Sequence, residues 1–86
     1  MEKEFLKSKI KTNLYQIVPD SNVALHKHKG YDEIFYCLKG QGFGILEDKE
    51  NKMNVGDTFI VKENTMHALS SNSEMWVASI LIPVIK

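Results

Sequence analysis

Three histidines and one glutamate stand out because their types and spacing suit a metal ion. His26 and His28 are two residues apart in a predicted strand, so both imidazoles are expected on one face of it. A glycine-containing turn then returns the chain, and a hairpin of this length can bring Glu33 beside the two histidines. His67 lies much further along the chain, and spacing alone does not say whether it joins them.

Imidazole nitrogens and a carboxylate oxygen are suitable ligands for iron, nickel, manganese, zinc, cobalt or copper. The chain contains one cysteine, Cys37, so a site built from several thiolates and an internal disulfide are both excluded. A plainer interpretation stays open, because an isolated histidine is more often a surface or core residue than a ligand. The residues thus predict a candidate site for one divalent transition metal ion, with exposed histidines as the alternative.

The elements that must position these residues are predicted to be strands. Short apolar runs alternate with turn-forming residues every eight to twelve residues, which is typical of an all-β domain. The predicted strands cover 14–18, 23–28, 33–38, 43–47, 52–54, 58–61, 66–70 and 74–85. We expect residues 1–86 to form a single domain, with 1–10 either a loosely held terminus or a segment exchanged with a partner.

The predicted strand at 33–38 is apolar on both faces, whereas a sheet with one face in water should be polar there. One face carries Glu33, Phe35 and Cys37, and the other carries Ile34, Tyr36 and Leu38. A chain of 86 residues has few elements with which to cover a second apolar face. We therefore expect a homodimer.

Composition excludes several kinds of partner. Eleven basic residues, all lysine, balance eleven acidic ones, so the chain has no electrostatic footprint for nucleic acid or for an anionic membrane. The first eleven residues are charged and lack the apolar stretch of a secretory signal. The apolar run 75–85 is too short to span a bilayer. We expect a cytoplasmic protein that binds neither nucleic acid nor membrane.

The spacing of these residues resembles the first sequence motif of the cupin family. That motif reads glycine, five residues, His-x-His, three or four residues, glutamate, six residues and glycine. Here His26 and His28 are followed by four residues, then Glu33, then six residues and Gly40. Asp20 stands at the position of the opening glycine.

The second cupin motif is also recognisable. It reads glycine, five residues, Pro-x-Gly, two residues, histidine, three residues and asparagine. Gly56 opens it and His67 falls at the histidine position, while Lys62 and Asn64 replace the proline and glycine and Ser71 replaces the asparagine. Asparagine tolerates a positive φ, so it can keep the turn that the glycine would make. The two motifs together cover most of the chain.

This resemblance implies an antiparallel jelly-roll β-barrel with a metal ion in its interior. By position, the implied ligands are His26, His28, Glu33 and His67. The expected interior residues near the metal are Phe35, Cys37, Phe43, Ile45, Phe59, Val61 and Trp76. For Cys37 we expect a small buried hydrophobe rather than a ligand.

Two classes of function follow from the resemblance. The first is a binding module in which the metal site holds a small organic ligand or stabilises the barrel. The second is a metal-dependent oxygenase, isomerase or decarboxylase that acts on a small organic acid or sugar. No arginine is available to orient a carboxylate and no second acid–base pair is evident, so the sequence favours the binding module. Whether the protein is an enzyme stays undecided at this point.

Overall fold

The computed structural model describes residues 9–20 and 23–85, and at 23–26 it describes the backbone without the side chains. The strands are β1 (Lys11–Ile17), β2 (Val23–His26), β3 (Tyr31–Leu46), β4 (Lys49–Asn54), β5 (Thr58–Val61), β6 (His67–Ser70) and β7 (Met75–Pro83). All pairings are antiparallel, which confirms the predicted all-β antiparallel fold. No helix in this described part of the chain is long and apolar enough to cross a membrane.

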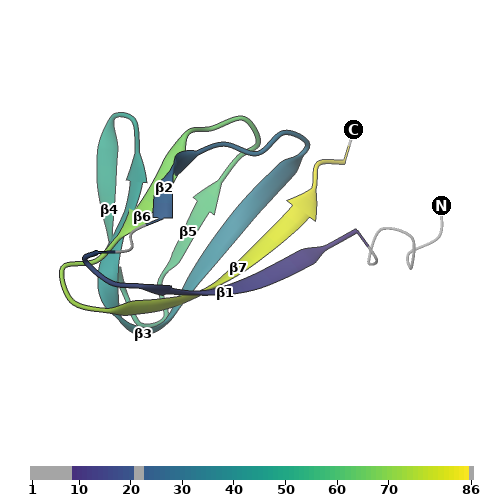
Figure 1. Cartoon of the computed structure of the whole chain (residues 1–86). Coiled ribbons are helices and arrows are strands. Elements are labelled where there is room, and N and C mark those ends of the chain that lie inside the picture. The colour runs from purple at the N-terminus through teal and green to yellow at the C-terminus, as the bar shows by residue number, and fades with distance from the viewer. Residues whose placement is uncertain (1–8, 21–22, 86) are drawn as a thin grey trace.

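The long strand β3 belongs to two sheets. Its first half pairs with β5 on one side and with β7 on the other, and β1 extends this group, which we call sheet A. Its second half pairs with β4 and β6, and β2 extends that group, which we call sheet B. The sheets diverge from β3 and face each other across the interior (Figure 1). Among the described residues, no strand ladder joins the far edges of the two sheets into a closed barrel.

A β-bulge sits where β3 passes from one sheet to the other. Cys37 pairs with Val77 and Lys39 pairs with Trp76, so Leu38 is an extra residue without a partner. An extra residue reverses the alternation of side chains along a strand. Before the bulge the odd-numbered residues of β3 point inward, and after it the even-numbered residues do.

The bulge overturns part of the predicted interior. Phe43 and Ile45 were expected to point inward, but both are only half-buried, while the glycines beside them in β3 are buried. Residues 33–38 and 43–47 are separate strands in the sequence prediction but parts of one strand in the structure. A reversal of side-chain alternation within β3 therefore could not be predicted. Trp76 was also expected inside, but in β7 it is Met75, Val77 and Ser79 that are buried.

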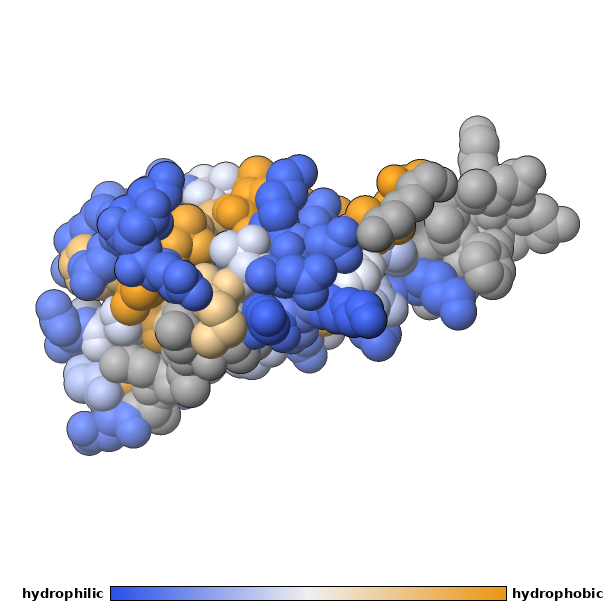
Figure 2. Space-filling view, turned by 90° about the horizontal axis from the view of Figure 1, so that it is seen from above, coloured by the Kyte–Doolittle hydropathy of each residue, from blue (hydrophilic) through white to orange (hydrophobic). Residues whose placement is uncertain are grey.

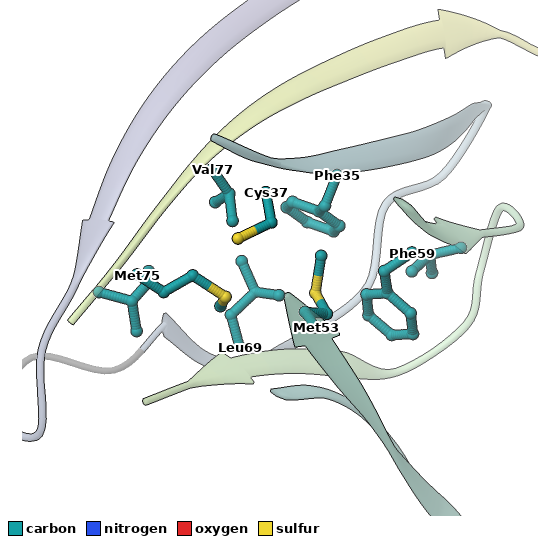
Figure 3. Close-up of a cluster of buried hydrophobic side chains, with 9 residues drawn as sticks. Phe35, Cys37, Met53, Phe59, Leu69, Met75 and Val77 are labelled. Atoms are coloured by element: carbon teal, nitrogen blue, oxygen red, sulfur yellow. The ribbon is translucent and has the colours of Figure 1, made fainter. Parts of the chain in front are cut away.

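The core fills the space between the two sheets. Phe35, Cys37 and Val77 point from sheet A towards Leu69 and Met53 of sheet B (Figure 3). Each of these side chains is at most 1% exposed, and burial of a large apolar side chain stabilises a fold by about 1.5–3 kcal/mol. The prediction that Phe35, Cys37, Phe59 and Val61 lie inside is confirmed.

Gly44 marks how tightly this interior is filled. It lies after the bulge on the inward face of β3, and a Cβ added there would lie 2.5 Å from the ring of Phe59. The interior therefore has room for an inward glycine at this position but not for a larger residue.

Gly44→Ala is expected to destabilise the protein by about 1–3 kcal/mol, because the new methyl group overlaps the Phe59 ring and the packed core yields little. Urea denaturation measures this change. In a Phe59→Leu background the same substitution should cost clearly less, because the ring that it meets is gone. Equal costs in the two backgrounds would contradict the packing argument.

Candidate metal centre

Glu33 is the centre of the candidate site. It projects inward from the first half of β3 and is 2% exposed. Its Oε1 atom lies 3.1 Å from Nε2 of His28 and 3.0 Å from Nε2 of His67. The structure thus brings together three of the four residues that the sequence predicted, although Glu33 and His67 are 34 residues apart in the chain.

His67 is held in one orientation and one tautomer. Its Nδ1 lies 2.8 Å from the carbonyl oxygen of Thr65, which can only accept, so Nδ1 carries a proton and donates it. Its ring also contacts the ring of Phe35, with centroids 5.8 Å apart. Nε2 is consequently the nitrogen that faces Glu33, and it is the one available to a metal ion.

His28 reaches the site from a loop and not from a strand. The predicted strand 23–28 ends at His26, so the alternation of a strand does not place His28. Its carbonyl oxygen instead accepts a hydrogen bond of 2.7 Å from the backbone N–H of Asn64. Asn64 has φ 60°, as expected for an asparagine in the place of a glycine. The β5–β6 loop therefore positions the segment that carries His28.

A second pair of contacts ties these two loops together. The backbone N–H of Gly30 donates to the Glu63 carboxylate at 3.1 Å, and the N–H of Glu63 donates to Asp32 at 2.9 Å. Both contacts join the turn after His28 to the turn before His67. One backbone–backbone hydrogen bond and two bonds from backbone N–H groups to carboxylates thus hold the segments that carry the two histidines together.

Ser79 is a site residue that the sequence reasoning missed. It is fully buried in β7 and its hydroxyl donates a hydrogen bond to Oε2 of Glu33. The sequence does contain a signal for it, because Ser79 is a polar residue within the apolar run of the last strand. With Oε2 occupied by Ser79, Oε1 is the carboxylate oxygen that faces the histidines.

The side chain of His26, the fourth predicted ligand, lies outside the described residues. Its backbone is described, and its Cα is paired with that of His67 across β2 and β6. The register between these strands is irregular between Val23 and His26. The prediction that His26 is a ligand stays a prediction.

The electrostatics of the site follow from these contacts. Burial disfavours the charge of Glu33, but hydrogen bonds from His67 and Ser79 and the positive charge of both histidines outweigh burial and lower its pKa. Burial likewise favours neutral His67, but its bonds to Glu33 and to the Thr65 carbonyl prevail and raise its pKa. Burial, and then the charge of Glu33, raise the pKa of Tyr15 in β1, so its hydroxyl lies within electrostatic range of the site.

The donor set fits a transition metal ion. One ligand atom each from His28, Glu33 and His67 can be chosen so that all lie within 4.8 Å of one another. Two imidazole nitrogens and a carboxylate oxygen suit iron, nickel, cobalt, copper or zinc. The hydrogen bond from His67 to the Thr65 carbonyl also fits a metal site, because a histidine that binds a metal ion normally donates its other N–H to a carbonyl or carboxylate.

Comparison with known proteins assigns the chain to a family. The sequence profile of the cupin domain matches residues 13–83, so the chain belongs to the cupin family. It is 29% identical over 69 residues to the oxalate-binding protein of Thermotoga maritima, covering 78% of this chain and 57% of that protein. It is 34% identical over 59 residues to quercetin 2,3-dioxygenase of Bacillus subtilis, covering 67% of this chain and 18% of the enzyme.

Solved structures agree with this assignment. A crystal structure described as a predicted oxalate decarboxylase of Thermotoga maritima superposes with a TM-score of 0.81 at 26% identity, covering 98% of this chain and 76% of the other. A cupin protein of Bacteroides fragilis gives 0.80 at 19% identity, covering 87% and 66% of the two chains. The chain also matches an uncharacterized protein of Methanocaldococcus jannaschii at 36% identity over 56 residues, 64% of this chain and 45% of that protein. It thus spans about half the length of the first two curated relatives.

In the metal-free protein, the pair formed by Glu33 and His67 is expected to stabilise the fold fully between about pH 4.5 and 6.5, the ordinary pKa values of the two groups. The pKa of Glu33 is lowered, so its contribution is lost as the pH falls from 4.5 through that lowered value. The pKa of His67 is raised, so its contribution is lost as the pH rises from 6.5 through that raised value.

Urea denaturation at a series of pH values measures this profile. Glu33→Gln keeps the shape of the side chain but removes its charge, so its profile should be flatter at both ends. A Glu33→Gln profile with the same two slopes as the parent protein would show that other groups cause the pH dependence.

Proposed function

We propose that this cupin binds one divalent transition metal ion through His26, His28, Glu33 and His67, and holds a small anionic organic ligand at that ion. The observation that carries the proposal is the convergence of two imidazole Nε2 atoms on one buried carboxylate oxygen. Outside a metal site, an inward glutamate in a small apolar core is costly unless it is fully paired. Binding of a metal ion would explain why the chain places a buried carboxylate between two imidazoles.

The backbone register supports His26 as the fourth ligand. The Cα of His26 is paired with that of His67 across β2 and β6, so the backbone of His26 lies beside the site.

The charge of the site favours an anionic ligand. One carboxylate and neutral imidazoles leave a divalent ion with about one net positive charge, in an interior where charges interact more strongly than in water. The similarity to the oxalate-binding protein of Thermotoga maritima supports a small carboxylate as that ligand. Because the chain contains no arginine, the metal ion would be the main group that orients it.

Catalysis by the same site is the second candidate. The similarity to quercetin 2,3-dioxygenase and to a predicted oxalate decarboxylase supports it. A bound metal ion would supply Lewis acidity or redox chemistry, and the hydroxyl of Tyr15 is the further ionisable group within electrostatic range of Glu33. The chain spans only 18% of the dioxygenase, so that enzyme's reaction does not carry over as a whole.

Purified protein is expected to contain about one transition metal ion per chain, and the double variant His26→Ala/His28→Ala should contain essentially none. Elemental analysis measures both. Lys27→Ala/Lys29→Ala is the matched control, because these two side chains are exposed, belong to the same segment and lack a metal-ligating imidazole. Full metal content in the histidine variant would refute the site, and the single His26→Ala variant tests whether His26 is a ligand.

Ser79→Ala is expected to weaken metal binding by about 10- to 100-fold, because loss of an outer hydrogen bond frees the Glu33 carboxylate to rotate. Titration of the metal-free protein with Co²⁺ or Zn²⁺ measures this. Ser73→Ala, in the exposed turn before β7, is the control and should bind as the parent does. Unchanged affinity in Ser79→Ala would mean that Glu33 needs no such support.

A further inference from the structure

Lys49 lies on the inner face of sheet B, in the same row of paired residues as His67. The Cα of Leu46 in β3 is paired with that of His67 in β6 and also with that of Lys49 in β4. Directly opposite residues share a face of an antiparallel sheet, and Leu46 packs against the core. Alternation along β4 agrees, because it puts Lys49 on the same face as the buried Met53. Two strand spacings separate the backbones of His67 and Lys49 by about 10 Å.

A groove runs along the edge of the molecule between β4 and β5, which no strand ladder joins among the described residues. Its volume is about 610 Å³, within the range of small-molecule sites. Its lining includes Leu46, Lys49, Asn51 and Phe59. The β3–β4 hairpin turn and the loop before β6 lie at the same end of the molecule (Figure 1), and the view down on this end shows apolar surface between hydrophilic groups (Figure 2).

Contacts between aromatic rings connect this groove to the metal centre. The ring of Phe59, in the wall of the groove, stacks on the ring of Phe35 with centroids 5.9 Å apart. Phe35 in turn contacts the ring of His67, with centroids 5.8 Å apart. The groove and the metal centre thus share an apolar wall.

The charges around the groove make its end nearest His67 positive. Asp57 lies beyond the opposite end of β4 from Lys49, and its carboxylate accepts a hydrogen bond of 2.8 Å from the backbone N–H of Asn54. The acidic residues of the hairpin turn, Glu47 and Asp48, border a separate hollow beside residues 64–66. Lys49 therefore supplies positive charge where the groove comes closest to the row of His67.

We propose that the ligand of the metal centre is a small organic dianion and that Lys49 binds its second anionic group. This inference rests on the proposed function, in which a first carboxylate lies at the metal ion. Leu46 stands between His67 and Lys49 in the row, so the carbon chain of the ligand packs against Leu46 and Phe59. The flexible stem of a lysine lets its ammonium reach anions of different lengths. In a chain without arginine, the metal ion and Lys49 are two separated positive charges that orient such a ligand.

Calorimetric titration of the Co²⁺-loaded full chain tests this inference. The probes are malonate, succinate and glutarate, each paired with the monoanion of equal chain length: propionate, butyrate and valerate. We expect the parent protein to bind at least one dianion about 10-fold more tightly than its monoanion, because of the second charge-assisted contact. Lys49→Gln should lose this preference and Lys49→Arg should keep most of it, with affinities for the monoanions unchanged. Lys49 is exposed, so neither substitution disturbs the core.

Lys52→Gln is the matched control. Lys52 belongs to the same strand and borders the same groove, but its ammonium lies 5.4 Å from the ring centroid of Phe43, on the outer face of sheet B. The control removes the same charge and should bind all six probes as the parent does. An equal loss in Lys52→Gln and Lys49→Gln would show a general effect of charge and overturn the inference. A preference that persists in Lys49→Gln would mean that both carboxylates bind the metal ion, and would overturn it too.

The visible spectrum of the bound Co²⁺ separates a failure of this inference from a failure of the proposed function. A carboxylate that binds the ion should change that spectrum in the parent protein and in Lys49→Gln alike. Spectral changes without any preference for dianions would overturn the inference and leave the proposed function standing. A spectrum that no carboxylate changes, or a chain that binds no Co²⁺, would overturn both.

Discussion

A carboxylate inside an apolar interior is the constraint on which this structure depends. Glu33 is almost completely buried, and an unpaired charge in such a place costs several kcal/mol. Three side chains from three different elements contact it: His28 from the loop after β2, His67 from β6 and Ser79 from β7. Each of these elements must be in place before Glu33 can be buried with all its partners, so formation of the site and packing of sheet A on sheet B are linked.

Much of the site could be predicted from the sequence because motif spacing carries information that single residues lack. Glu33 and His67 are 34 residues apart, and only the length of the two motifs linked them. The contact between Asn64 and His28 explains why the spacing matters. Asn64 stands where the second cupin motif has a glycine, and its backbone N–H donates a hydrogen bond to the carbonyl oxygen of His28. A change in either loop length would break that bond.

The parts that could not be predicted depend on packing between strands. The bulge at Leu38 reverses the alternation inside β3, which the prediction divided into the separate strands 33–38 and 43–47, so Phe43 and Ile45 were assigned to the wrong face. Trp76 was expected inside, whereas its smaller neighbours Val77 and Ser79 in β7 occupy the interior. The location of His28 outside β2 was equally hidden, since the strand pattern continues through it.

The bulge is also what lets one strand serve both the core and the metal centre. In a regular strand, Phe43 and Ile45 would share the inward face with Glu33, and their side chains would need volume that Phe59 already fills beside Gly44. Reversal of the alternation puts glycines there and turns Leu46 towards the interior, where its Cα is paired with that of His67. The position of His67 relative to Glu33 therefore depends on a backbone irregularity at Leu38, which contributes no side chain to the site.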